Sequence, residues 1–139
     1  MSSDLYQQAV AVAARAYAPY SEFLVGAAVR VAEKAYAPYS SYLVGAAVRA
    51  RDGRVFEGVN VENASYPLGI CAERAALARA VVEGCRPGDL EEIAVTASPC
   101  GGCRQWIYEF RLDRVTFRGS DGEIVTRTPA ELLPETFEL

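Results

Sequence analysis

Histidine is absent from the 139-residue sequence. This absence excludes a Ser-His-Asp triad, a Cys-His pair, an imidazole general base and any metal site that depends on imidazole ligands. Any catalytic chemistry must therefore use carboxylates, cysteine, lysine, tyrosine or a metal ion held by thiolates. Long apolar runs are absent as well, because the longest one, residues 23–29, ends at Arg30. No membrane span is expected.

Positive charge is also scarce. Lysine and arginine number 14 against 18 aspartates and glutamates, which gives a net charge of −4. Nucleic-acid binders carry a basic stripe, so no nucleic-acid partner is expected. The first residues lack the cationic start of a signal peptide, and four cysteines are few for a disulfide-stapled protein. We therefore expect a cytoplasmic protein whose cysteines stay reduced.

The composition over residues 1–139 is that of one globular domain. The sequence also contains a tandem repeat. AYAPYSEFLVGAAVR at 16–30 returns as AYAPYSSYLVGAAVR at 35–49. Two copies do not make a solenoid, so residues 16–34 are interpreted as a tandem-duplicated insert. We expect the second copy to provide a strand and residues 25–34 to provide a helix. The hexapeptide VGAAVR would then be helical once and extended once.

Strand and helix patterns alternate along the rest of the chain. Asp52-Gly53 between two apolar runs predicts a hairpin of strands at 42–50 and 54–61. Further strands are predicted at 92–97, 115–118 and beyond the turn at 120–122, and helices at 4–17, 71–83, 103–110 and from the capping box at Thr128. This order predicts an α/β fold with three layers, in which helices cover a mixed sheet of about five strands.

Three cysteines open two of the predicted helices. Cys100 and Cys103 form a CxxC pair, which alone fits half a zinc site, a thioredoxin-like redox pair or chance. Cys71 opens another helix, and two helix N-termini can bring three thiolates to one tetrahedral metal ion. Three protein ligands leave a fourth position for water, as in catalytic zinc sites. Glu73, two residues after Cys71, is placed to face that water without binding the metal.

These segments resemble the zinc-dependent cytidine deaminase family, in its small, all-cysteine, homotetrameric form. CAER at 71–74 and PCGGCRQ at 99–105 carry the zinc motif, and similar segments extend the resemblance over residues 35–137. The resemblance implies a three-layer α/β/α deaminase fold and one Zn²⁺ per chain on three cysteines, Cys71, Cys100 and Cys103. It also implies a nucleoside substrate and a homotetramer with its sites near the subunit interfaces.

The same resemblance implies roles for individual side chains. Glu73 would move protons between water, the ring nitrogen of cytosine and the departing ammonia. Arg74 follows Cys71 by three residues and Arg104 directly follows Cys103, and each would donate a hydrogen bond to sulfur. Substrate contacts are implied for Tyr42, Asn60, Glu62, Ala72 and, from a neighbouring subunit, Phe137.

Each of these assignments has a purely structural alternative. The two arginines fit helix-surface cations, Asn60 and Glu62 fit a solvated strand face, and Tyr42 and Phe137 fit core aromatics. The leading functional hypothesis is hydrolytic deamination of free cytidine and deoxycytidine in pyrimidine salvage. One alternative is a blasticidin S deaminase-like activity, because that enzyme shares the zinc motif. The family usually has a longer loop before Ser98, and this departure bears on which substrate is bound. Another is a non-catalytic structural zinc module in which Cys85 supplies a fourth ligand.

Overall fold

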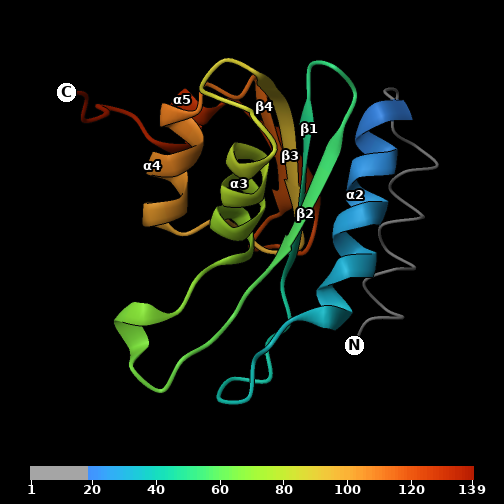
Figure 1. The fold of residues 1–139 in the computed structure, drawn as a ribbon, viewed down its shortest axis with the longest axis vertical. Helices are drawn as coiled ribbons and strands as arrows, with labels where there is room; N and C mark the ends of the chain where they lie inside the picture. Colours follow the sequence, from blue (N-terminus) through green and yellow to red (C-terminus); the bar gives the residue numbers. More distant parts are fainter. Residues whose placement is uncertain (1–18) are drawn as a thin grey trace.

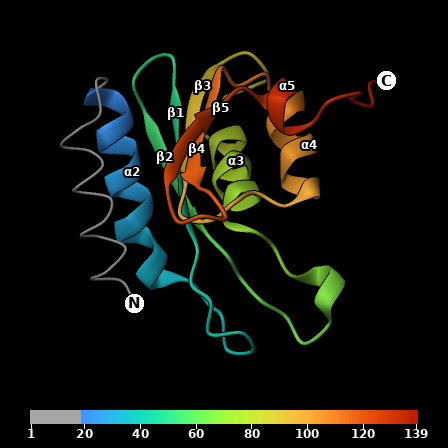
Figure 2. The ribbon, with the colours of Figure 1, turned by 180° about the vertical axis from the view of Figure 1, so that it is seen from behind.

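The computed structural model describes residues 19–139, which form a three-layer structure around one mixed sheet (Figures 1 and 2). The strand order is β2-β1-β3-β4-β5, with β1 at Gly45–Ala50, β2 at Val55–Val59, β3 at Leu90–Val95, β4 at Arg114–Arg118 and β5 at Ile124–Arg127. Helix α2 (Pro19–Val31) covers one face, and the other face carries α3 (Ala72–Val82), α4 (Gly101–Glu109) and α5 (Pro129–Leu132). Two 3₁₀ turns complete the described elements, η1 at Ala32–Lys34 and η2 at Tyr66–Leu68. The predicted α/β/α architecture is confirmed.

The predicted hairpin joins β1 to β2, with Val48 opposite Phe56. Gly53 adopts a φ of +95°, which a tight turn requires and which glycine reaches without steric cost. Strand β3 pairs antiparallel with β1 and parallel with β4. Both hairpin strands are shorter than predicted, since β1 begins at Gly45 and β2 ends at Val59.

The two copies of the repeat adopt different structures and pack against each other. Residues 25–30 lie within α2, whereas residues 45–49 of the identical hexapeptide lie in β1, as predicted. The apolar side chains that join α2 to the sheet are Leu24, Ala27, Ala28, Ala47 and Ala94. A Cβ atom added to Gly45 would lie 2.1 Å from the Ala28 carbonyl oxygen, so only glycine permits this approach. Tertiary packing therefore decides which copy is helical.

Helix α2 also begins earlier than predicted. Its described part already runs from Pro19, six residues before the predicted start at residue 25. The same Pro-Tyr-Ser triplet forms a turn at 38–40 in the second copy. The helix predicted at 4–17 lies outside the described residues.

We expect a protein lacking residues 16–34 to fold and to bind metal like the full chain. The deletion joins Arg15 to Ala35. Apolar residues from the segment before Arg15 then have the same spacing before Ala35 as the α2 residues that face the sheet. In this set Leu5, Ala9 and Val12 replace Leu24, Ala28 and Val31. The shortened chain thus keeps the helical period that packs on β1. Circular dichroism and zinc analysis of the purified deletion protein test this expectation, and an insoluble or zinc-free product would contradict it.

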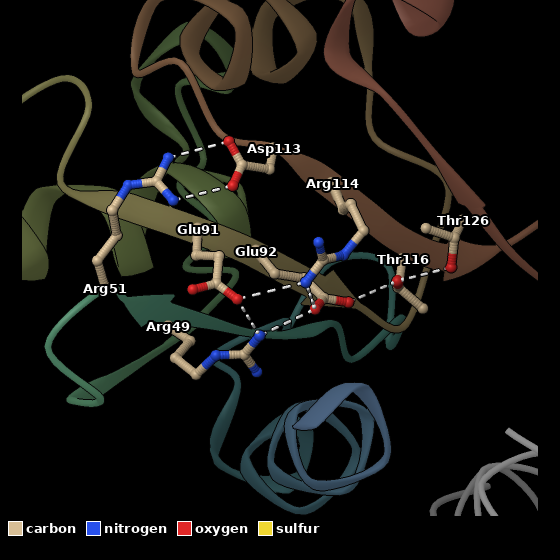
Figure 3. Close-up of polar contacts among 8 residues, drawn as sticks. All are labelled: Arg49, Arg51, Glu91, Glu92, Asp113, Arg114, Thr116 and Thr126. Carbon is tan, nitrogen blue, oxygen red and sulfur yellow. Dashed lines mark hydrogen bonds and ion pairs between the residues drawn. The ribbon is translucent and has the colours of Figure 1, made fainter. Parts of the chain in front are cut away.

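A buried charged network links four strands on the α2 side of the sheet (Figure 3). Glu92 is fully buried, and its Oε1 accepts hydrogen bonds from Arg49 at 3.2 Å and Arg114 at 3.1 Å. Its Oε2 accepts a hydrogen bond from Thr116, whose hydroxyl also contacts that of Thr126. Burying a carboxylate is costly unless it is paired and hydrogen-bonded, and these partners meet that requirement. The network joins β3 to β1, β4 and β5.

The opposite face of the sheet holds the main core and positions α3. Ile93, Leu77 and Ile107 are fully buried there between β3, α3 and α4. A Cβ atom on Gly58 would lie 2.3 Å from the Ala76 backbone nitrogen, so β2 and α3 are in close backbone contact. This contact places the start of α3 beside the end of β2. None of the described helices has the length and apolarity needed to cross a membrane.

Candidate active site

Two helix N-termini converge where the metal ligands were predicted. Cys71 is the N-cap residue of α3 and Cys100 the N-cap residue of α4, while Cys103 lies buried in the first turn of α4. The N-terminal N–H groups and the positive end of the helix dipole favour negative charge at these positions. The local sequence thus places three thiols where thiolates are stabilised.

The three cysteine sulfurs have the spacing that one tetrahedral metal ion requires. All three lie within 4.8 Å of one another, and the Cys71 and Cys100 sulfurs are 3.9 Å apart. Two sulfurs on a tetrahedral zinc ion, at about 2.3 Å from the metal, are about 3.8 Å apart. The donor set therefore fits zinc. Cys85 lies outside this cluster, in the hydrophobic core with its sulfur 3.7 Å from Arg54, which argues against the four-cysteine module.

The electrostatics of the cluster favour a thiolate. A hydrogen bond from the Cys103 thiol, together with the Arg74 guanidinium, lowers the pKa of Cys71 to about 5. The same hydrogen bond raises the pKa of Cys103 well above that of a free thiol. All four cysteines are free thiols. The cluster therefore already has thiolate character. A bound metal ion would take the place of the protons that the sulfurs share.

Glu73 lies in the first turn of α3 and is only 4% exposed. Burial, together with the nearby Cys71 thiolate, raises the pKa of Glu73 to about 7. A buried carboxyl of this kind can exchange a proton near neutral pH, as a general acid or base must.

The two arginines that follow the clustered cysteines make different contacts. Arg74 Nη2 donates a hydrogen bond to the Cys71 sulfur at 3.3 Å, and its buried Nε has no hydrogen-bond partner within the described region. Arg104 does not donate to sulfur, which corrects the sequence-based expectation. Its guanidinium instead donates to the Pro99 carbonyl, the Leu132 carbonyl and the Ser98 hydroxyl. Arg104 thus links the turn before Cys100 to the C-terminal segment by hydrogen bonds.

A cavity of about 540 Å³ opens beside the cysteine cluster. Its walls include Cys71, Ala72, Glu73 and Cys100, together with residues from two loops, 39–44 and 60–70. In Figure 1 these loops are drawn in cyan and green and project from the same end of the sheet. Cavities of 300–1,000 Å³ are typical of small-molecule sites.

Asn60 and Glu62 line this cavity, although they lie beyond β2 rather than on it as predicted. Backbone bridges from Val61 to Tyr36 and to Ile70 keep the segment extended, and the two side chains still reach the same loop. Asn60 accepts a hydrogen bond from the Val44 N–H and donates one to the Tyr42 carbonyl, both at 2.9 Å. The Glu62 carboxylate accepts hydrogen bonds from residues 39 and 40.

The remaining predicted contacts fall in two places. Tyr42 and Ala72 line the cavity, and Tyr42 is 55% exposed. Phe137 lies on the C-terminal tail, 68% exposed and away from the cavity of its own chain. Its carbonyl accepts a hydrogen bond from Gln105 on α4. The structure therefore brings together every predicted site residue except Arg104 and Phe137.

Sequence reasoning missed the Tyr39-Ser40 turn, which lines the cavity and holds Glu62. The repeated AYAPYS segment contained both residues, but a duplicated motif by itself does not indicate which residues contact the site. Thr96 was also missed. Its hydroxyl accepts a hydrogen bond from the Gly45 N–H and fixes the end of β3 against β1, just before the ligand turn.

Comparison with known proteins finds a matching family and several similar sequences. Residues 27–118 fit the family described as "Cytidine and deoxycytidylate deaminase zinc-binding region". Cytidine deaminase of Halalkalibacterium halodurans is 44% identical, with 96% of this chain and 91% of that protein covered. Cytidine deaminase of Mycobacterium tuberculosis is 37% identical over 94% of this chain and 85% of its own length.

Solved structures agree in fold. The crystal structure of cytidine deaminase from Burkholderia pseudomallei has a TM-score of 0.77 and 45% identity, covering 83% of this chain and 97% of that one. Cytidine deaminase from Mycobacterium tuberculosis gives a TM-score of 0.74 at 36% identity, over 86% of this chain and 98% of that one. Since the family match spans more than half of the residues, this chain belongs to the cytidine and deoxycytidylate deaminase family of zinc-dependent enzymes.

Proposed function

We propose that this protein hydrolyses free cytidine and 2′-deoxycytidine to uridine and 2′-deoxyuridine, as a step of pyrimidine salvage. The observation that carries the proposal is the meeting of three cysteine sulfurs with the buried Glu73 carboxyl beside a nucleoside-sized cavity. The relatives named above are cytidine deaminases. The net charge of −4 favours a free nucleoside over a polynucleotide.

We assign one zinc ion per chain to Cys71, Cys100 and Cys103. When bound, zinc supplies a Lewis acid that makes a water molecule acidic enough to attack near neutral pH. Glu73 accepts the proton of the attacking water and delivers it to the cytosine ring nitrogen beside the amino-bearing carbon. Glu73 then accepts the remaining proton of the added hydroxyl group and donates it to the amino group, which leaves as ammonia. Burial strengthens the Glu73 carboxylate as a base, because burial disfavours its charged form.

Two arginines support the ligands in different ways. Three thiolates carry more negative charge than a divalent ion neutralises, and this excess weakens the ion as a Lewis acid. The Arg74 hydrogen bond draws electron density from the Cys71 sulfur and offsets part of that excess. Arg104 acts as a positioning residue, because its contacts hold the Ser98-Pro99 turn from which Cys100 emerges.

The loop residues supply contacts for the nucleoside. Glu62 has about four acceptor positions, of which three are used, so its carboxylate can still accept a hydrogen bond from a ribose hydroxyl. The Asn60 amide likewise keeps one N–H and one lone pair beyond its two loop contacts. Tyr42 and Ala72 are assigned to the base, against which Tyr42 presents an aromatic ring.

Assembly as a homotetramer would complete the site. Tyr39, Tyr42 and Tyr66 line the cavity, yet each is more than half exposed, and exposed apolar clusters mark protein interfaces. Phe137 is exposed and does not line the cavity of its own chain, so we assign it to the cavity of a neighbouring subunit.

Light scattering is expected to give four times the 15.0 kDa chain mass. The variant Phe137→Ala should remain tetrameric but lose about tenfold in kcat/KM, the equivalent of one aromatic contact. Mixing and reassembling Phe137→Ala with Glu73→Gln should restore activity, because intact sites would receive Phe137 from the neighbouring chain. An active monomer, or mixed tetramers with no recovery, would contradict this assembly.

An absorbance assay with cytidine, 2′-deoxycytidine and blasticidin S tests the substrate assignment. We expect turnover of both nucleosides and little of blasticidin S. The reverse preference would favour the blasticidin S alternative, for which the short connection between β3 and Ser98 is the relevant feature.

We also propose that residues 1–139 form one domain. The free thiols fit a reducing compartment, and we propose the cytoplasm.

A further inference from the structure

Ser40 occupies the junction between two residues assigned to the substrate. Its hydroxyl donates a hydrogen bond to Glu62 Oε2 and accepts one from the Tyr42 N–H at 3.0 Å. Its backbone N–H donates to Glu62 Oε1 at 3.1 Å, beside the Tyr39 N–H at 2.9 Å. Ser40, Glu62 and Tyr42 all line the cavity.

The hydroxyl of Ser40 constrains the Glu62 carboxylate in a way that the two backbone donors do not. Both backbone N–H groups bind Oε1, whereas the hydroxyl binds Oε2. A carboxylate held at one oxygen can still rotate, but a carboxylate held at both oxygens has a defined plane. The free lone pair of Glu62 then has one direction. The Ser40 hydroxyl is also the leading cause that lowers the pKa of Glu62, which keeps this carboxylate ionised as an acceptor.

Apart from the Tyr42 N–H, which donates to the Ser40 hydroxyl, the rest of the loop is held by contacts that do not involve Ser40. Asn60 binds the Tyr42 carbonyl and the Val44 N–H, and backbone bonds join Tyr36 to residues 60 and 62. Removing the Ser40 hydroxyl therefore leaves Tyr42 with its Asn60 contact, while Glu62 loses the only donor to Oε2 within the described residues.

We propose that Ser40 is a positioning residue that orients the Glu62 carboxylate toward the sugar hydroxyls of the substrate. The assignment rests on the nucleoside function proposed above. It makes Ser40 a determinant of sugar recognition, acting through Glu62, rather than a part of the deamination chemistry. A substrate whose sugar ring has no hydroxyl groups should not depend on Ser40.

The test compares cytidine with 2′,3′-dideoxycytidine, which lacks both ring hydroxyls of the sugar. In Ser40→Ala we expect kcat/KM for cytidine to fall about tenfold through KM, the scale of one hydrogen bond to a charged group. For dideoxycytidine, kcat/KM should stay within about twofold, since no contact to Glu62 is lost. Ser40→Thr keeps the hydroxyl and should rescue cytidine kinetics. Ser41→Ala, a change at the adjacent exposed serine, is the matched control and should behave as wild type.

A second readout does not depend on activity. An NMR titration of the Glu62 carboxyl, assigned with Glu62→Gln, should show its pKa rising toward the ordinary glutamate value in Ser40→Ala and not in Ser41→Ala. Equal losses for both nucleosides, unchanged cytidine kinetics or an unchanged Glu62 pKa would each overturn the proposal. A wild-type protein inactive on cytidine would contradict the proposed function instead, and the Glu62 titration would still decide the Ser40 assignment.

Discussion

Glu73→Gln is expected to abolish turnover while leaving zinc and the fold in place. Glutamine fills the same space in the buried first turn of α3, where Glu73 is 4% exposed, but its amide cannot accept the water proton or return it. A positioned acid–base group contributes about 10²–10⁴-fold, and here one carboxyl serves every proton transfer of the proposed reaction. We therefore expect a loss in kcat of at least this size.

The matched control is Glu83→Gln, which makes the same chemical change at the exposed C-cap of the same helix. Kinetics with cytidine, zinc content by atomic absorption and far-UV circular dichroism should be measured on both variants. We expect Glu83→Gln to match the wild type in all three. If Glu73→Gln kept a tenth of wild-type turnover, the proton-transfer role would belong to another group.

Replacing any one of the three clustered cysteines is expected to remove both zinc and activity. Each substitution, Cys71→Ala, Cys100→Ala or Cys103→Ala, leaves two thiolates, too few to hold zinc in the three-ligand site that the sulfur spacing indicates. We expect zinc to fall from one ion per chain to a trace, because none of the described residues offers a fourth metal-binding side chain within the cluster.

Cys85→Ala is the control for these substitutions. Cys85 is equally a free thiol, but it lies in the main hydrophobic core and outside the cluster. Metal analysis should find wild-type zinc in this variant. Full zinc in Cys71→Ala would rule out the proposed ligand set, and loss of zinc in Cys85→Ala would restore the four-cysteine module as an explanation.

Local sequence was sufficient to place the three clustered cysteines and Glu73 at the starts of two helices. Cys71 and Cys100 precede segments with strong helical patterns, so their place at helix starts followed from short-range signals. Glu73 follows Cys71 by two residues, and this spacing places it in the first turn. The hairpin at Asp52-Gly53 was predictable for the same reason, because turn chemistry is local.

The contacts of the arginines and of the loop depended on distant parts of the chain. Arg74 and Arg104 both lie within three residues of a clustered cysteine, yet Arg74 donates to sulfur and Arg104 donates to the Leu132 carbonyl, 28 residues further along the chain. Ser40 contacts Glu62, 22 residues away, only because backbone bonds place the two loops side by side. No spacing rule within either loop predicts such a pairing.

The repeat separates most clearly what sequence and tertiary structure each determine. By itself the sequence determined that two nearly identical segments exist, that a three-cysteine site opens two helices and that Glu73 accompanies it. Only the tertiary structure decided that VGAAVR is helical at 25–30 and lies mostly in β1 at 44–49. Identical residues have identical intrinsic propensities, so the choice came from packing. The second copy pairs with β2 and β3, and the first covers the face of the sheet that this pairing creates.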